Sequence, residues 1–389
     1  MEDLHLSASK LSVVAFMVVI TLAALRAYRY PEYSSDGFQY MANAVAMHGA
    51  DARQIHDAVY REIYAGIPNN IQGHLLGKDT VETSQSISFR ERAANAERFA
   101  EFLPCFAVRP IFNELVYIFH YWFGIGLLRA VVLIPVLSYW VMGWVALLWI
   151  TKYSGAAVAA VLTSILVVTP PVWELARSTT PDALSALVLL GGLYLILETD
   201  RIAVGVALLL ISIYVRTDNV LIALLALAYL TWKRKIDLLK AAVLAIVAVV
   251  SVPLINHFAG DYGPAMLYYR VFVAIPIAPG EMTVHFGFHD YLVALRTGMA
   301  SAIHESFIPF VLMGAIGLVR RASAAIVALT LLAMAFGVAH LVLYPDPEER
   351  FFGLFFVAMG ISVASALFQR TPSSVEQSSQ LPWRELVTR

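Results

Sequence analysis

The dominant pattern along the chain is a series of long uncharged runs separated by short polar turns. A membrane-spanning helix needs about 20 mostly apolar residues, and uncharged runs approach or reach this length at ten places. These runs are residues 11–25, 130–151, 153–173, 183–197, 202–215, 219–232, 241–260, 306–320 (less its final Arg), 322–345 and 351–369. The pattern predicts an all-α polytopic membrane protein with about ten transmembrane helices.

Two longer polar stretches interrupt this series, residues 29–128 and 261–302. The first has two helix-like segments, 37–48 and 88–101, and ends in the mixed segment 110–128, which carries Glu114 and His120. That last segment either spans the membrane or lies in the interface as an amphipathic helix started by Pro110. Neither stretch contains a repeat or a flexible linker, so we expect one integral membrane domain over residues 1–370. Residues 371–389 form a polar tail.

Basic residues in short loops orient the spans, because cytoplasmic loops are enriched in Lys and Arg. If alternate loops are assigned to one side, that side collects nine basic residues and the opposite short turns collect three. The nine are Lys152, Arg201, Lys233, Arg234, Lys235, Lys240, Arg320, Arg321 and Arg370; the three are Arg177, Arg216 and Arg350. The tail is therefore expected in the cytoplasm. Charge alone leaves the N-terminus open, because Lys10 precedes the first run while Arg26 and Arg29 follow it.

Composition narrows the class of protein further. Hydrophobic residues make up 59% of the 389 residues and charged residues only 14%, against about 25% charged in soluble domains. Disordered chains, disulfide-rich secreted domains and ordinary soluble enzymes are excluded. The net charge of −1 gives no indication of a nucleic-acid partner. The single cysteine, Cys105, cannot form an intrachain disulfide.

Charged residues at one side of the membrane are the candidates for chemistry. The runs 202–215 and 219–232 each contain 14 residues, which as helix cover roughly 21 Å of a core about 30 Å thick. Arg216 and Asp218 between them must lie below the surface, where ionisable groups are tolerated when paired or facing water. Four clusters share this side and mix carboxylates with arginines or polar residues: residues 33–40 (YSSDGFQY), 173–182 (WELARSTTPD), 214–219 (YVRTDN) and 344–350 (YPDPEER).

Each cluster also has a purely structural interpretation. Asp36 could cap a helix over residues 37–47, Asp182 could complement a helix dipole in the first turn, and Arg177 could be an interface residue that reaches toward water. Arg216 and Asp218 could simply pair with each other, and residues 346–349 could form a solvated turn. No zinc-protease, Walker A, GxGxxG or GxSxG motif occurs, so no cofactor is expected and a divalent metal is not indicated.

From residue 11 to about 368 the chain resembles the GT-C superfamily of integral membrane glycosyltransferases. The likeness is to the polyprenyl-phosphate-sugar-dependent branch, which includes protein O-mannosyltransferases and lipid A aminoarabinose transferases. It rests on residues 35–44 (SDGFQYMANA), 109–112 (RPIF), 176–184 (ARSTTPDAL), 215–219 (VRTDN) and 349–352 (ERFF) in their order among the spans. The resemblance implies an N-terminus in the cytoplasm, a first loop on the outer face, and an interfacial rather than spanning segment 110–128.

The resemblance also implies roles for individual residues. Asp36 occupies the position of the family's acceptor-activating acid, and Arg109 and Asp182 match a basic and an acidic family position. Family members often have a second acid beside the first; Gly37 stands there, which argues against a two-carboxylate or metal-assisted scheme.

The resemblance thus implies transfer of a sugar from a polyprenyl-phosphate donor to a glycan, lipid or protein acceptor on the outer face of the inner or plasma membrane. Asp36 would be the base, with Arg216 and Arg350 on the donor phosphate. The supporting site residues would be Arg109, Arg177, Asp182 and Asp218. The alternatives are a lipid-linked glycan transporter or flippase, a non-catalytic membrane subunit, or a membrane acyltransferase.

Overall fold

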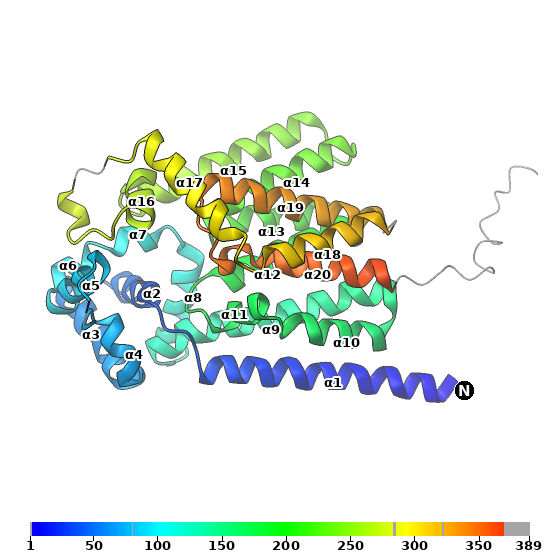
Figure 1. Cartoon of the computed structure of the whole chain (residues 1–389), viewed down its shortest axis with the longest axis horizontal. Coiled ribbons are helices and arrows are strands. Elements are labelled where there is room, and N and C mark those ends of the chain that lie inside the picture. Colours follow the sequence, from blue (N-terminus) through cyan, green and yellow to red (C-terminus); the bar gives the residue numbers. More distant parts are fainter. Residues whose placement is uncertain (1, 80, 283–284, 321–322, 369–389) are drawn as a thin grey trace, which may run out of the picture.

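The computed structural model describes residues 2–79, 81–282, 285–320 and 323–368; the predicted tail, 371–389, lies outside them. Regular structure in the described residues is helical, apart from one isolated β-bridge between Glu32 and Ser178. Long helices run side by side in a bundle, and shorter helices gather at one end of it (Figure 1). We call this end, formed by α2–α8 and α16, the loop end. The all-α class expected from the sequence is confirmed.

The bundle and its loop end are built from different parts of the chain. The bundle helices are α1 (Glu2–Arg29), α9 (Leu127–Ser154), α10 (Ala156–Val167), α11 (Pro170–Arg177), α12 (Asp182–Glu198), α13 (Ile202–Ser212), α14 (Val220–Trp232), α15 (Leu238–Phe258), α18 (Phe307–Val319), α19 (Ala324–Leu343) and α20 (Gly353–Leu367). The first long loop forms α2 (Ser35–Met47), α3 (Ala52–Gly66), α4 (Asn69–Leu75), α5 (Ser84–Ala94), α6 (Ala96–Ala100), α7 (Leu103–Ala107) and α8 (Pro110–Tyr121). The second forms α16 (Gly263–Phe272), η2 (Pro279–Glu281) and α17 (Phe288–Ala302), and two 3-10 turns, η1 (Thr217–Asn219) and η3 (Glu349–Phe352), precede α14 and α20.

Five helices in the described residues are long and apolar enough to cross a membrane, or eight if each bent pair is one span. The five are Lys10–Arg29, α9, α15, α19 and Glu349–Leu367. The run 153–173 does not form one straight helix, because Pro170 starts α11 at an angle of 67° to α10. The helix α13 has 11 residues, which rise about 17 Å. The expected count of ten spans therefore stays a prediction.

The segment 110–128 forms the short helix α8 and then passes into α9. With 12 residues, α8 is about 18 Å long, and it turns by 118° from the segment Ala96–Ala107 before it. Pro110 occupies its first turn, as the sequence predicts. A helix this short is too short to span a core of about 30 Å, so its length favours the interfacial alternative.

Two hydrophobic cores stabilise the molecule. The larger lies inside the bundle around Trp149, Leu190 and Phe356, and the smaller lies under the first long loop around Tyr40 and Phe112. In contrast, α1 and α15 are only 22% buried over their most apolar stretches. Apolar surface of this extent is covered by lipid in a membrane protein.

Contacts between the two long loops hold the second loop against the first. Arg98 pairs with Glu281 at 2.8 Å, the Ser88 hydroxyl donates to the Pro276 carbonyl at 2.9 Å, and the Tyr262 hydroxyl donates to a backbone carbonyl of the first loop. The helix expected over residues 88–101 is divided into α5 and α6, because Asn95 adopts an extended backbone and caps α6. This division lets α6 turn toward the second loop.

Candidate functional site

Asp36 lies in the first turn of α2, but it does not cap the helix as the structural interpretation supposed. The cap is Ser34, which has an extended backbone and whose hydroxyl accepts from the Gly37 amide at 3.4 Å. Ser34 is also within hydrogen-bonding distance of the Thr179 hydroxyl, at 3.0 Å. The Asp36 side chain is therefore free to make contacts outside its own helix.

Those contacts are two ion pairs with arginines from distant elements. Asp36 Oδ1 lies 3.1 Å from Arg270 Nη2 on α16, and Oδ2 lies 3.4 Å from Arg350 Nη2 in η3. Burial would raise the pKa of Asp36, but the nearby guanidinium groups of Arg270, Arg350, Arg109 and Arg92 outweigh it and lower the pKa below its usual value. Asp36 is thus held as a carboxylate.

Arg216 is held between two carboxylates in a buried network. Its Nη1 contacts Asp182, and its Nε and Nη2 bind the two oxygens of Asp218 at 3.0 and 2.9 Å. The arginine is 7% exposed and Asp182 3%. Because a paired buried charge is far less costly than an isolated one, the pairing explains how these groups are tolerated at this depth. The expected pair of Arg216 and Asp218 forms, with Asp182 as a third member.

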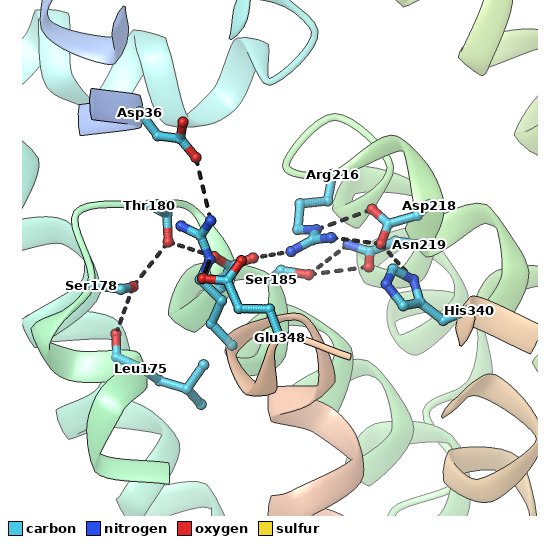
Figure 2. Close-up of polar contacts among 12 residues, drawn as sticks. Asp36, Leu175, Ser178, Thr180, Ser185, Arg216, Asp218, Asn219, His340 and Glu348 are labelled. Atoms are coloured by element: carbon cyan, nitrogen blue, oxygen red, sulfur yellow. Dashed lines mark hydrogen bonds and ion pairs between the residues drawn. The ribbon is translucent and has the colours of Figure 1, made fainter. Parts of the chain in front are cut away.

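The network continues away from the cavity to His340 on α19. His340 Nδ1 lies 3.0 Å from Asp218 Oδ2, and the side chain is 1% exposed. Next to it, the Asn219 amide donates to the Ser185 hydroxyl at 2.8 Å and to the Ser212 carbonyl at 2.9 Å. Figure 2 shows Arg216, Asp218, Asn219 and His340 pointing toward one another. In the sequence, His340 is a single ionisable residue within a long apolar run, which is the pattern that marks a candidate functional residue in a membrane protein.

All four predicted clusters contribute to one cavity of about 720 Å³ at the loop end. The charged residues lining it are Glu32, Asp36, Arg109, Asp182, Arg216, Arg270, Asp346, Glu348 and Arg350. Residues 346–349 are therefore not simply a solvated turn, since Glu348 pairs with Arg350 Nε at 2.7 Å. Burial raises the pKa of both Asp346 and Glu348.

The predicted arginines differ in their place at this cavity. Arg109 lines it and pairs with no carboxylate in the described residues; its guanidinium lies 5.9 Å from the centre of the Tyr40 ring. Arg177 does not line it. Arg177 pairs with Glu174 at 2.7 Å and lines a neighbouring cavity of about 590 Å³. The two cavities share Arg350 in their walls.

Sequence reasoning missed Arg270 and Arg92. Arg270 is a single basic residue in the short aromatic helix α16, and nothing in its neighbourhood in the sequence shows that it reaches Asp36. Arg92 is 5% exposed and its guanidinium lies between the Phe89 and Phe102 rings, at 4.6 and 4.4 Å from their centres. Burial lowers the pKa of Arg92 to about 10. Both residues add positive charge around Asp36.

A third cavity, which is mainly apolar and has a volume of about 340 Å³, adjoins the charged one, and Leu267 lines both. Its walls come from α7, α15 and α16, and include Val252, Pro253 and Met266. In the described residues, no group of three or more His, Cys, Asp or Glu side chains is placed to hold a metal ion. The loop end thus combines a charged cavity with an apolar one.

The chain matches no protein-family model, no curated protein and no solved structure. The resemblance to GT-C glycosyltransferases therefore rests on the residues quoted above.

Proposed function

We propose that the protein is an integral membrane glycosyltransferase of GT-C type, which transfers a sugar from a polyprenyl-phosphate donor to an acceptor. One observation carries the proposal: a carboxylate, Asp36, lies between two arginines in a polar cavity that adjoins an apolar one. A polyprenyl-phosphate sugar has the matching parts, since it joins a polar sugar to an anionic phosphate and a long apolar chain.

The arginines of the cavity suit the phosphate. A guanidinium presents its donors in a planar fork that matches phosphate oxygens, and Arg109, Arg270 and Arg350 all line the cavity. The apolar cavity, which begins at Leu267, would take the first isoprenoid units. Arg216, predicted as a phosphate ligand, already binds Asp182 and Asp218, so it would support the wall of the cavity and not bind the phosphate itself.

In the proposed reaction Asp36 takes the proton of the acceptor hydroxyl. The acceptor oxygen forms its bond to the anomeric carbon as the bond from that carbon to the phosphate oxygen breaks. The electron pair stays on the phosphate, which gains negative charge that Arg350 stabilises. General-base assistance of this kind is worth about 10²–10⁴ in rate.

The count of nine basic residues against three supports an orientation with the loop end outside and both termini in the cytoplasm. The site would then face the periplasm or cell exterior from the inner or plasma membrane. The acceptor would be a glycan, lipid or protein that reaches this face. In this arrangement Asp182, Asp218 and Arg177 would support the walls of the site.

The test is release of the lipid product. Purified protein in detergent is incubated with a radiolabelled polyprenyl-phosphate sugar and a cell-envelope extract as the acceptor source. We expect polyprenyl phosphate to appear together with label in the acceptor fraction. Label that stays on the lipid with every sugar tried would refute the proposal, whereas movement of intact lipid-sugar across a vesicle membrane would favour the transporter alternative.

A further inference from the structure

Both oxygens of Asp36 are occupied in the free protein. Oδ1 pairs with Arg270 and Oδ2 with Arg350, and the side chain is 22% exposed. A general base needs an oxygen that can accept a hydrogen bond from the acceptor hydroxyl. A carboxylate bound by two guanidinium groups is a weak base, because both pairs favour its charged form.

Arginines surround Asp36 on the wall of the cavity. The guanidinium groups of Arg109, Arg270 and Arg350 line the cavity beside it, and Arg109 pairs with no carboxylate in the described residues. The lining as a whole carries no positive excess, since its carboxylates outnumber its arginines five to four. A phosphate would therefore be bound by the arginines at Asp36 and not by the charge of the cavity as a whole.

Arg270 is also available to an anion. In the described residues its only ion pair is with Asp36, and its guanidinium lies 4.4 Å from the centre of the Phe106 ring. It has 15% side-chain exposure and lines the cavity. An incoming phosphate would compete with Asp36 for the N–H groups of Arg270. It would compete in the same way for the Nη2 group of Arg350.

We propose that the donor phosphate takes Arg270 and Arg350 over from Asp36, so that Asp36 becomes a free base only after the donor has bound. This inference rests on the proposed function. In this proposal Arg270 binds the phosphate of the lipid-sugar donor. Binding of the donor also releases Asp36, which can then act as the base in the transfer. An acceptor that arrives first meets a carboxylate that cannot take its proton.

The charge seen by the arginines is conserved through this reaction. Before transfer, Asp36 and the phosphodiester carry one negative charge each. As the acceptor oxygen bonds to the anomeric carbon, the carbon–oxygen bond to phosphate breaks, its electron pair goes to the phosphate and the acceptor proton goes to Asp36. Afterwards Asp36 is neutral and the phosphate carries two negative charges. Arg270 and Arg350 therefore face the same total charge and need no compensating movement.

The proposal predicts a pH dependence of donor binding with a definite sign. The groups facing Asp36 are Arg270 of α16, Arg350 of η3, Arg109 before α8, Arg92 of α5, Glu348, and Tyr40 and Tyr344. These arginines lower the pKa of Asp36 in the free protein, and a bound anion that draws them away raises it. Binding then takes up protons, so donor affinity rises as the pH falls between the free and bound pKa values. A phosphodiester itself does not titrate in that range.

The experiment measures binding of radiolabelled donor, and of didecyl phosphate as a diester without sugar, from about pH 8 to about pH 5 in the absence of acceptor. We expect wild-type affinity to rise toward acidic pH, by at most tenfold per pH unit for one proton. In Asp36→Asn the dependence should be lost. Asp57→Asn, which changes an exposed carboxylate on α3, should behave as wild type, and thermal unfolding at each pH checks that every variant is folded.

A second variant separates this inference from the proposed function. Arg270→Gln removes one ion pair of Asp36, so the acidic limb of kcat/KM should move to higher pH while donor affinity falls. A pH-independent wild-type affinity, an unchanged dependence in Asp36→Asn, or no binding of either diester would each overturn the inference. If transfer is observed alongside any of these results, the glycosyltransferase proposal stands. Only the inference that donor binding releases Asp36 would then be wrong.

Discussion

Arg270 and Asp36 are 234 positions apart in the sequence, yet Arg270 Nη2 lies 3.1 Å from Asp36 Oδ1. The contact joins the second long loop to the first helix after α1. It forms because the second loop is anchored to α5 and α6 by the Ser88 and Arg98 contacts, which bring α16 near Asp36. The charged cavity is therefore assembled by two loops together with the ends of bundle helices.

Replacing Asp36 with Asn tests its chemical role. The cap of α2 is Ser34, so Asp36→Asn should leave α2 intact, and it should bind donor at neutral pH at least as well as wild type because two arginines are released. Asn cannot take a proton, so transfer should fall by at least ~10²-fold. Single-turnover kinetics with saturating donor measure the loss.

Asp237→Ala is the control for Asp36→Asn. It removes the N-cap of α15, a residue that does not line the charged cavity, and should cost about 0.5–2 kcal/mol of stability while transfer per folded molecule is kept. Near-wild-type turnover in Asp36→Asn would contradict the assignment of the base.

Arg350 should contribute to the affinity for the lipid-sugar donor, because its guanidinium N–H groups can form hydrogen bonds to the phosphate. A hydrogen bond to a charged group is worth about 1.5–3 kcal/mol, so Arg350→Ala should weaken donor binding by roughly 10- to 100-fold. Arg350→Lys should restore only part of this, because Lys lacks the planar fork. Equilibrium binding of labelled donor measures both, with the exposed Arg53→Ala on α3 as a control; wild-type affinity in Arg350→Ala would remove this residue from the phosphate site.

Arg216 should matter for stability more than for donor contact. Its removal leaves Asp182 and Asp218 as buried carboxylates without their cation, and breaking a buried pair typically costs about 3–5 kcal/mol. Arg216→Ala should therefore unfold well below the wild-type temperature. Arg177→Ala breaks a partly exposed pair with Glu174 and should cost about 0–1 kcal/mol. Similar melting temperatures for the two variants in a thermal unfolding assay would contradict the structural role of the Arg216 network.

The predicted orientation can be tested with reporter fusions. A reporter after Lys235 should be cytoplasmic, and reporters near Pro279 and near Asp79 should be external, because the excess of basic residues lies on the side of Lys235. Alkaline phosphatase and green fluorescent protein fusions report the two sides. A cytoplasmic position for Asp79 would place Asp36 on the wrong side for an extracytoplasmic transfer reaction.

The sequence by itself determined the class of the fold and the positions of most helices. Long uncharged runs specify α9, α15, α19 and α20, because a helix is the only segment that satisfies its own backbone hydrogen bonds in lipid. The sequence also indicated which charged residues lie within the membrane. The apolar runs on either side of Arg216 and Asp218 are too short to place these residues at the membrane surface. The sequence left the N-cap of α2 open among Ser34, Ser35 and Asp36, because three adjacent capping residues cannot be ranked from local pattern, and Ser34 forms it.

Only the tertiary structure decided how the charges pair. Asp182 could pair with Arg177, five residues before it, but it contacts Arg216 instead, since α12 and η1 meet inside the bundle. Likewise nothing local links Arg270 to Asp36. Hydrophobic periodicity specifies which face of a helix is buried but leaves open which helix it meets, and ion pairs between distant elements depend on that packing. The apolar helices could therefore be predicted from local composition. The charged site could not, because it forms only where loops and helix ends from distant parts of the chain meet.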